Sequence, residues 1–516
     1  MESLTAVNIL WSICSTLLVY TVAKGIYNVY FHPLSHIPGA KLAAAGPFYE
    51  FYYDVVKDGF FGRFKNGIVP MGRPIVRIAV NEVHIRDSEY YHQIYSGNSR
   101  RINKDPATVG AFSVPTSVAA TIDHFHHRAR RSYLNPYFSR RAILDIEPLI
   151  QERLDRLCGR FERALKAATV LNLDAAFAAL TADVITMRFY GEHFDYLGVA
   201  DFRSTIRETF AGASRIYHLS RFVPGLVATL KRLPLFIVRL LLPAMADLHN
   251  IREGIKANIV TSSVDDSSRN RSKAVIALTL QDSNIPAEER GIDRLMDEGT
   301  TLIFAGTETT ARALSVAFFH LLDNPNVIHQ LRSELAALSA STSDHDSQHS
   351  LHQLEQLPYL TGVVQESFRL SFGAVGRLPR VATHDALRYG SYSIPPGTPI
   401  SQSAFFVHTD PTVFPNPHTF SPERWTQERH DGVPLTRYLV SFTKGSRQCL
   451  GIPMAYAEMY LTIARIVQRF DLELHDTTAH DIAVHHVRLV GYPKRGSGAP
   501  STFGEVEVKV IGKSAR

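Results

Sequence analysis

One cysteine near the carboxyl end constrains this chain more than any other feature. The segment 442–451 reads Phe-Thr-Lys-Gly-Ser-Arg-Gln-Cys-Leu-Gly, and an apolar helical pattern follows it, which predicts Cys449 at a junction between a loop and a helix. The positive end of the helix dipole, Arg447 and nearby backbone amides favour a thiolate there. Gly445 and Gly451 leave room for the backbone to approach a flat macrocycle. The segment therefore predicts a thiolate at Cys449, the state that an anionic metal ligand requires.

The two other cysteines, Cys14 and Cys158, indicate no comparable chemistry. Three cysteines cannot form a disulfide scaffold in a chain of 516 residues. Cys14 lies in an apolar segment and Cys158 on the apolar face of a predicted helix, where a thiol behaves as a small hydrophobic group. Cys449 is therefore the cysteine with a case for function.

Composition predicts an ordinary folded enzyme. The chain is 45% apolar and 20% charged, which excludes disordered and fibrous classes, and no long linker divides it. One large catalytic domain over residues 41–516 is expected. The formal charge of +6 is spread along the chain, so we expect no nucleic-acid partner but a basic face for an acidic protein or lipid headgroups.

The amino end predicts a membrane anchor over residues 1–24. No charge occurs from Ser3 to Ala23, a stretch that approaches the roughly 20 residues of a bilayer span. The alternative is a cleaved signal peptide, which Glu2 before the apolar run and Lys24 after it disfavour. Residues 25–40 contain two prolines and are expected to form a hinge.

The remaining pattern predicts a mainly α protein with a small β-rich region near the amino end. Residues 75–80 alternate and are rich in β-branched side chains, which predicts a strand that 82–85 continues. Apolar residues recur at helical spacing through 143–261, and 286–323 is expected to be one long helix. The segment 222–242 predicts paired short helices at a membrane surface rather than a second span.

The segment 442–451 resembles the heme-binding signature of the cytochrome P-450 family. Its five fixed positions make a chance match on the order of one in tens of thousands. The resemblance implies the mostly α fold of that family, with heme b (iron protoporphyrin IX) between the long helix and the cysteine loop. It implies Cys449 as the axial ligand of the heme iron. Two further residues of the signature would lie against the heme, Phe442 and Gly451.

Cations are expected at the two heme propionates, where the forked donors of arginine are favoured. Arg131, Arg380 and Arg447 match positions that contact heme in the family. His127 stands where the family usually has tryptophan, so another histidine of 124–127 could serve instead. A metal cluster of these histidines is the alternative, but no carboxylate or second pair has convincing ligand spacing, which favours a solvated basic face.

Two further motifs follow in the order of the family. Residues 305–310 resemble its oxygen-activation motif, which implies that Thr309 supports activation of bound dioxygen and that Glu308 connects it to solvent protons. A Thr/Glu cluster on a surface helix is the alternative. Glu366 and Arg369 form an E-x-x-R pair that alone is worth a few tenths of a kcal/mol. With Arg424 they match a buried network that holds the cysteine loop in the family.

The resemblance implies a heme-thiolate monooxygenase that inserts one atom of dioxygen into an apolar small molecule, by hydroxylation or epoxidation and in one or several steps. No dinucleotide or phosphate-binding motif is present, so its electrons must come from a partner. An NADPH–cytochrome P-450 reductase is expected, with a b-type cytochrome as a second candidate. The expected location is the endoplasmic reticulum membrane, with one amino-terminal span and the catalytic domain in the cytosol.

Residues 27–34, 134–139 and 442–451 are similar to fungal family members of the trichodiene oxygenase type, which implies a terpenoid or other secondary metabolite as substrate. By the same analogy, 111–119 and 222–242 would line the pocket. Three single residues would join them, Leu302, Ala305 and Val375. Two rivals stay open: a heme-thiolate isomerase or dehydratase that needs no redox partner, and a membrane heme protein without turnover.

Overall fold

The computed structural model describes residues 2–57, 60–64, 74–97, 100–109, 114–223, 225–230, 232–264, 275–341, 348–428, 431–493 and 505–514. The chain divides into two compact units. Unit 1 comprises Met1–Asp105 and Arg377–Ser403, and unit 2 comprises Pro106–Gly376 and Ala404–Arg516. The expected domain 41–516 is therefore shared between both units.

Unit 1 is built on a five-stranded sheet with the order β1-β2-β8-β5-β3, and β6 and β7 form a separate hairpin. The strands are β1 (Ile75–Arg77), β2 (Val83–Ile85), β3 (Ile102–Lys104), β5 (Arg380–Ala382), β6 (Leu387–Tyr389), β7 (Tyr392–Ile394) and β8 (Pro399–Ser401).

The small sheet near the amino end is as predicted, but its first strand is not continuous. Strands β1 and β2 are antiparallel, with Ile75 opposite Ile85. The chain reverses between them, where the Ile78 amide donates to the Glu82 carbonyl at 3.0 Å. The prediction that 82–85 continues the first strand was wrong, because Asn81 between the two segments lies in a turn.

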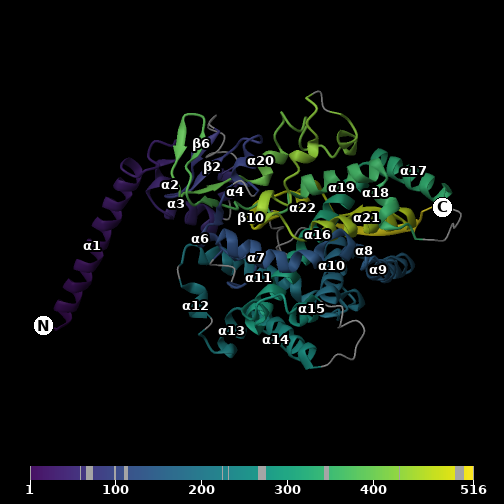
Figure 1. Ribbon diagram of the computed structural model, residues 1–516, viewed down its shortest axis with the longest axis horizontal. Coiled ribbons are helices and arrows are strands. Elements are labelled where there is room, and N and C mark those ends of the chain that lie inside the picture. Colours follow the sequence, from purple (N-terminus) through teal and green to yellow (C-terminus); the bar gives the residue numbers. More distant parts are fainter. Residues whose placement is uncertain are drawn as a thin grey trace. The chain divides into compact units, whose positions relative to one another are not determined.

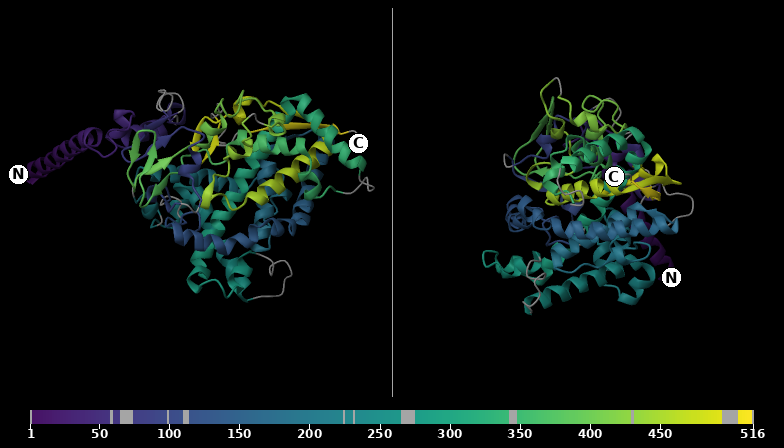
Figure 2. Two further views of the ribbon diagram at one scale, coloured as in Figure 1. Left: turned by 45° about the horizontal axis from the view of Figure 1, so that its top comes forward. Right: turned by 90° about the vertical axis from the view of Figure 1, so that its right-hand side faces the viewer.

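Helix α1 (Glu2–Tyr30) is the predicted anchor segment of unit 1. Among the described residues, Val7–Tyr30 is the one stretch long and apolar enough to cross a membrane, and its most apolar part is exposed. Figure 1 and the left view of Figure 2 show α1 as one continuous rod with the amino terminus at its free end. At the other end, Arg77 donates to the Asn28 carbonyl at 2.8 Å. Because α1 ends at Tyr30, it includes the first residues of the expected hinge 25–40.

The other helical segments of unit 1 are short. They are α2 (Lys41–Ala45), α3 (Phe48–Phe51), a π-helical turn (Tyr52–Val56), α4 (Phe60–Arg63) and α5 (Tyr91–Ile94).

Unit 2 is mainly helical, and its helices have the following bounds: α6 (Pro106–Val109), α7 (His124–Leu134), α8 (Arg140–Leu144), α9 (Glu147–Ala167), α10 (Leu173–Tyr190), α11 (Thr205–Ser220), α12 (Leu226–Leu230), α13 (Leu235–Leu241), α14 (Pro243–Val264), α15 (Val275–Gln281), α16 (Ile292–Asp323), α17 (Pro325–Ser341), α18 (Leu351–Glu355), α19 (Pro358–Ser371), α20 (Ala404–His408), α21 (Ile452–Arg469) and α22 (Ala479–Ile482). Its strands are β4 (Val170–Asn172), β9 (Phe470–His475), β10 (His486–Arg488), β11 (Val490–Tyr492) and β12 (Glu507–Lys513).

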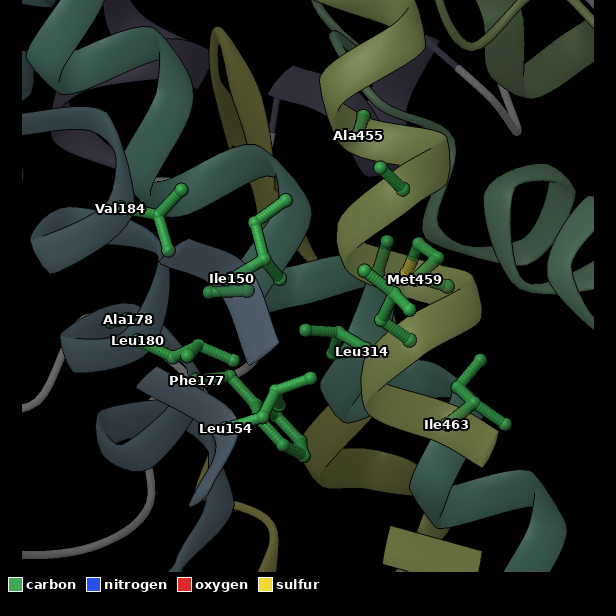
Figure 3. Packing of buried hydrophobic residues seen from close by; sticks show 14 of the residues in the cluster. Ile150, Leu154, Phe177, Ala178, Leu180, Val184, Leu314, Ala455, Met459 and Ile463 are labelled. Carbon is green, nitrogen blue, oxygen red and sulfur yellow. The ribbon is translucent and has the colours of Figure 1, made fainter. Parts of the chain in front are cut away.

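Four long helices, α9, α10, α16 and α21, enclose the core of unit 2. Figure 3 shows Leu154 of α9, Phe177 of α10, Leu314 of α16 and Met459 of α21 pointing toward one another, and all four are buried. Apolar residues recur at helical spacing on α9 and α21, which present an apolar face to their neighbours, whereas α10 and most of α16 are buried on nearly all sides. This packing fixes α16 and α21, the two helices that carry or follow the predicted site.

The predicted long helix 286–323 corresponds to α16, which begins six residues later than predicted. Residues Ala287–Arg290 form a separate 3-10 turn, and Gly291 has an extended conformation before α16 begins at Ile292. The end at Asp323 is as predicted, since Pro325 disfavours a helical Asn324. The predicted paired helices within 222–242 are α12 and α13, while Pro224 and Lys231 lie outside the described residues.

Candidate functional site

The cysteine loop ends where α21 begins, as the sequence predicts. Gly445 has a φ of +77°, a conformation that favours glycine, and a 3-10 turn follows over Gly445–Arg447. The Cys449 amide donates to the Phe442 carbonyl at 3.0 Å and closes the loop. The Cys449 side chain is open to solvent, and a Cβ added to Gly451 would meet nothing within 4 Å. The thiol is therefore accessible to a ligand.

The surroundings of the Cys449 thiol act on its pKa in opposite directions. Burial raises the pKa of Cys449, although the Gly451 amide and Arg131 act in the opposite direction. The accessible edge of the side chain does not offset the protein packed around the rest of it. The expected stabilisation of the thiolate by local dipoles and cations is present, but desolvation exceeds it.

Two of the predicted cations lie beside this loop in unit 2. Arg131 of α7 donates to the Gln448 carbonyl. Arg447 is buried and donates to the carbonyls of Thr121 and Ile122 at 2.7 and 2.5 Å. Both guanidinium groups thus support the backbone around Cys449.

The third predicted cation, Arg380, belongs to β5 of unit 1. It is 6% exposed, donates to the carbonyls of Leu378 and Pro379 at 3.0 and 3.3 Å, and lies 5.0 Å from the ring of Tyr95. Within the described part of the chain, neither Arg380 nor Arg131 pairs with a carboxylate. Arg377, three residues earlier, pairs with Glu50 and Glu82. A buried guanidinium without an acid fits an anionic ligand group.

His127 lies on α7 one turn before Arg131 and is buried. Its neighbour His126 pairs with Glu289 at 2.8 Å. In the described residues, the one group of three potential metal ligands is Asp183, His193 and Asp195, so the alternative of a metal cluster within 124–127 gains no support.

The middle of α16 presents an open face in a helix that is otherwise largely buried. Ala305 and Thr309, one turn apart, are exposed, and the Thr309 hydroxyl donates to the Ala305 carbonyl at 2.8 Å. A Cβ on Gly306 would approach Ile185 of α10 to 3.0 Å. This glycine thus permits close packing of α10 against α16.

Glu308, the neighbour of Thr309, is buried on another face of the helix. Burial raises the pKa of Glu308 to about 7, Arg207 and Arg312 act to lower it, and Asp174 adds to the increase. The Arg207 Nε lies 3.7 Å from Glu308 Oε1. This carboxyl can therefore exchange a proton near neutral pH.

A second acid at α16, Glu458 of α21, was missed by sequence reasoning. It is 1% exposed, and burial raises its pKa well above the usual value while a hydrogen bond with Thr310 opposes the shift. The available signal was one acid among the apolar positions of the helix that follows Cys449.

The predicted network of Glu366, Arg369 and Arg424 is assembled in unit 2. Arg369 donates through Nε and Nη2 to the two oxygens of Glu366 at 2.8 and 2.7 Å, and both side chains are fully buried. Arg424 Nε reaches Glu366 Oε1 at 3.1 Å. Trp425, which sequence reasoning did not single out, donates to Glu366 Oε2 at 2.9 Å. The carboxylate of Glu366 is thus enclosed by donors.

This network is connected to the cysteine loop. Arg369 donates to the His408 carbonyl at 2.8 Å, and the Nε2 of the same histidine accepts from the Val440 amide at 2.9 Å. Ser441 donates to the Phe368 carbonyl at 2.7 Å. His408 was also missed, because a single histidine after an apolar run gives no sign of its contacts.

The predicted pocket residues differ in exposure. Ala305 is exposed, whereas Leu302 is 8% and Val375 is 1% exposed. In the predicted wall 111–119, residues 111–113 lie outside the described residues.

Comparison with known proteins gives the family of this chain. The sequence profile of cytochrome P-450 matches residues 79–496. The chain is 52% identical over 495 residues to the cytochrome P-450 monooxygenase TRI4 of Trichoderma arundinaceum, covering 96% of this chain and 95% of that protein. It is 48% identical to the monooxygenase SAT11 of Stachybotrys chartarum over 96% of this chain and 94% of that relative. It is 46% identical to the monooxygenase pbrB of Penicillium brasilianum, over 93% of this chain and 94% of that relative.

The chain belongs to the cytochrome P-450 family. It is a heme-thiolate monooxygenase whose cofactor is iron protoporphyrin IX, and it requires a substrate, dioxygen and a redox partner. The residues beside the cysteine loop in unit 2 fit this cofactor, since they include an accessible thiol and the Arg131 guanidinium, which has no acid partner among the described residues.

Proposed function

We propose that Cys449 supplies the thiolate that binds the heme iron. The single observation that carries this proposal is the accessible Cys449 side chain at the start of α21, beside a glycine with open space around it. Because burial raises the pKa of the free thiol, ionisation of Cys449 would depend on a positive charge, which bound heme iron would supply. Phe442 and Gly451 would complete the loop that holds the heme.

Arg131 and Arg447 would hold heme propionates from unit 2, and His127 would assist from the same helix as Arg131. For Arg380, the support is its burial in unit 1 without a carboxylate partner among the described residues. Bidentate guanidinium groups suit two charged propionates better than point charges do.

Bound heme activates dioxygen with two electrons and two protons, so that one oxygen atom enters the substrate and the other leaves as water. Thr309 would offer its hydroxyl on the open face of α16. Glu308, with a pKa of about 7, would pass protons toward that face from the buried side of the helix. Glu366, Arg369 and Arg424 would hold the cysteine loop without taking part in the reaction.

The substrate that we propose is an apolar terpenoid or related fungal secondary metabolite, oxidised by hydroxylation or epoxidation. The support is the similarity to fungal monooxygenases, together with a relative named conidiogenone synthase that is 40% identical over 482 residues. Ala305, Leu302 and Val375 would belong to the pocket wall.

Electrons would come from an NADPH–cytochrome P-450 reductase, with a b-type cytochrome as a second donor. The exposed apolar helix α1 would anchor the chain in the endoplasmic reticulum membrane, followed by the proline-containing segment 25–40 and the catalytic domain 41–516 in the cytosol.

The test is a reduced carbon monoxide difference spectrum of the full chain and of Cys449→Ala. We expect a thiolate-type band for the wild type and its loss in the variant, and a wild type without the band would overturn the proposal. Turnover with labelled dioxygen, NADPH and reductase should place one labelled atom in the product. Turnover of hydroperoxides alone would instead favour the isomerase or dehydratase, and no turnover would favour the non-catalytic heme protein.

A further inference from the structure

Two adjacent acids near the start of α16, Asp297 and Glu298, have no role in the proposed reaction. They are 4% and 1% exposed. Burying a carboxylate is costly unless hydrogen bonds and cations compensate for the lost water. What these two acids contact therefore indicates what they do.

Asp297 holds one residue of the segment 114–122, which precedes α7. Its Oδ2 accepts from the Thr116 amide at 3.0 Å and from the Thr116 hydroxyl at 2.6 Å. Its Oδ1 pairs with Arg252 of α14 at 2.8 Å. The carboxylate thus joins two helices to the segment.

Glu298 holds the same segment two residues further on. Its Oε2 accepts from the Val118 amide at 2.9 Å, and Arg294 pairs with it from the preceding turn of α16. Burial raises the pKa of Glu298, and Arg294 and the Val118 amide oppose that shift. Two backbone amides of 114–122 are therefore held by adjacent acids of one helix.

The far end of the segment contacts the cysteine loop. Arg447 donates to the carbonyls of Thr121 and Ile122 at 2.7 and 2.5 Å. Arg130 of α7 donates to the Thr121 hydroxyl at 2.9 Å, and that hydroxyl donates to the Ser117 carbonyl at 2.7 Å. The segment thus links α16 at one end to Arg447 at the other.

We propose that Asp297 and Glu298 are positioning residues that fix the segment 114–122 and, through its carbonyls, the guanidinium of Arg447. The consequence is that the start of α16 helps to set the geometry beside Cys449. This inference rests on the proposed function only for its effect on heme.

Hydrogen exchange of the full-length holoenzyme tests the first part. Asp297→Asn should accelerate exchange of the amides 116–121 by roughly 10-fold or more, because it weakens hydrogen bonds to a charged acceptor. Thr116→Val should give a smaller increase, since it removes one donor and leaves the buried acid unchanged. Thr116→Ser keeps both donors and should exchange at the wild-type rate.

Asp293→Asn is the matched control, because Asp293 is an exposed acid one turn earlier on α16. It should leave exchange of 116–121 unchanged. Wild-type exchange in both Asp297→Asn and Thr116→Val would overturn the inference. If Asp297→Asn accelerated amide exchange in α9 and α10 as much as in 116–121, the inference would also be overturned, since the variant would then loosen the whole unit.

Transfer of heme to apomyoglobin tests the effect on Arg447. Asp297→Asn should release heme several-fold faster than Asp293→Asn. Faster exchange in 116–121 with unchanged heme release would overturn the link to Arg447. If the wild type lacked the thiolate-type band, the proposed function would fail, while the exchange rates of 116–121 would still decide whether the acids hold this segment.

Discussion

Two buried glutamates of unit 2, Glu366 of α19 and Glu308 of α16, show opposite solutions to the same physical problem. Both are at least 95% buried and both lie near arginines. Glu366 accepts from Arg369, Arg424, Trp425 and the Ser421 amide. In the described part of the chain, no hydrogen-bond donor reaches Glu308 Oε1, and Arg207 stays 3.7 Å away.

The number of donors decides what each carboxyl can do. A carboxylate enclosed by donors is held in one place, which suits a support for the cysteine loop. A carboxyl that is buried with few donors has a pKa near neutral pH and can exchange a proton. Burial alone therefore does not distinguish a structural acid from a functional one.

Removing the charge of Glu366 should have the largest effect. Glu366→Gln leaves two buried guanidinium groups without their carboxylate, so we expect a loss of about 3 to 5 kcal/mol in the free energy of unfolding. The thiolate-type band in the carbon monoxide spectrum should decrease with it. Chemical denaturation and the spectrum measure both effects.

Glu355→Gln is the control for this comparison, because Glu355 pairs with the exposed Arg140. Its effect should stay below about 1 kcal/mol. Equal losses in the two variants would contradict the special role of the buried network.

Glu308 should make stability depend on pH. Its pKa is raised from 4.5 to about 7 in the folded chain, so the folded state holds the proton more tightly than the unfolded state. The free energy of unfolding should fall as pH rises from about 4.5 to 7, by up to about 3 kcal/mol, and then level off. Glu308→Gln should lack this component, so its stability relative to the wild type should increase between pH 5 and 8 in denaturation experiments.

The variant Glu308→Gln should also slow the reaction. Loss of a positioned proton donor is expected to lower the rate of product formation by about 100-fold. In the wild type the rate should fall as pH rises through about 7, because the protonated fraction of Glu308 decreases, while the variant should show no such step. Glu288→Gln, an exposed glutamate before α16, should retain the wild-type rate and profile. An unchanged step in Glu308→Gln would remove Glu308 from the proton path.

Trp425→Phe tests one donor of the Glu366 network. It removes the indole N–H that reaches Glu366 Oε2 at 2.9 Å and keeps most of the apolar contact. We expect a loss of about 2 kcal/mol, the usual effect of losing a hydrogen bond to a charged group. Trp11→Phe in the exposed anchor helix is the matched control and should leave thermal unfolding of the globular part unchanged. Similar melting curves for all three proteins would show that Trp425 contributes little.

Arg207→Gln should have the smallest effect of the series. Arg207 lowers the pKa of Glu308, so its removal should move the pH step of the reaction upward. Arg203→Gln, on the exposed segment before α11, should leave the step in place. A downward shift in Arg207→Gln would contradict the electrostatic role that the geometry indicates.

Motifs with fixed spacing allowed prediction of the cysteine loop, the E-x-x-R pair and the acid–alcohol pair of α16. The turn that separates β1 from β2 was not predicted, and the start of α16 was placed six residues early. Those errors have one cause, since a turn at Ala79–Asn81 or an extended Gly291 depends on a few backbone angles that apolar periodicity does not record. Trp425, His408 and Glu458 were missed because each acts through contacts with residues distant in sequence.

The amino-acid sequence by itself determined the family, the cofactor class and Cys449 as the proposed ligand, because these depend on residue types at short, fixed spacing. Tertiary structure decided that burial raises the pKa of that thiol, that Glu366 is surrounded by donors while Glu308 is not, and that Asp297 and Glu298 hold the segment before α7. The physical reason is that pKa values and hydrogen-bond partners depend on how many donors and how much water surround each group. Packing of distant helices sets both.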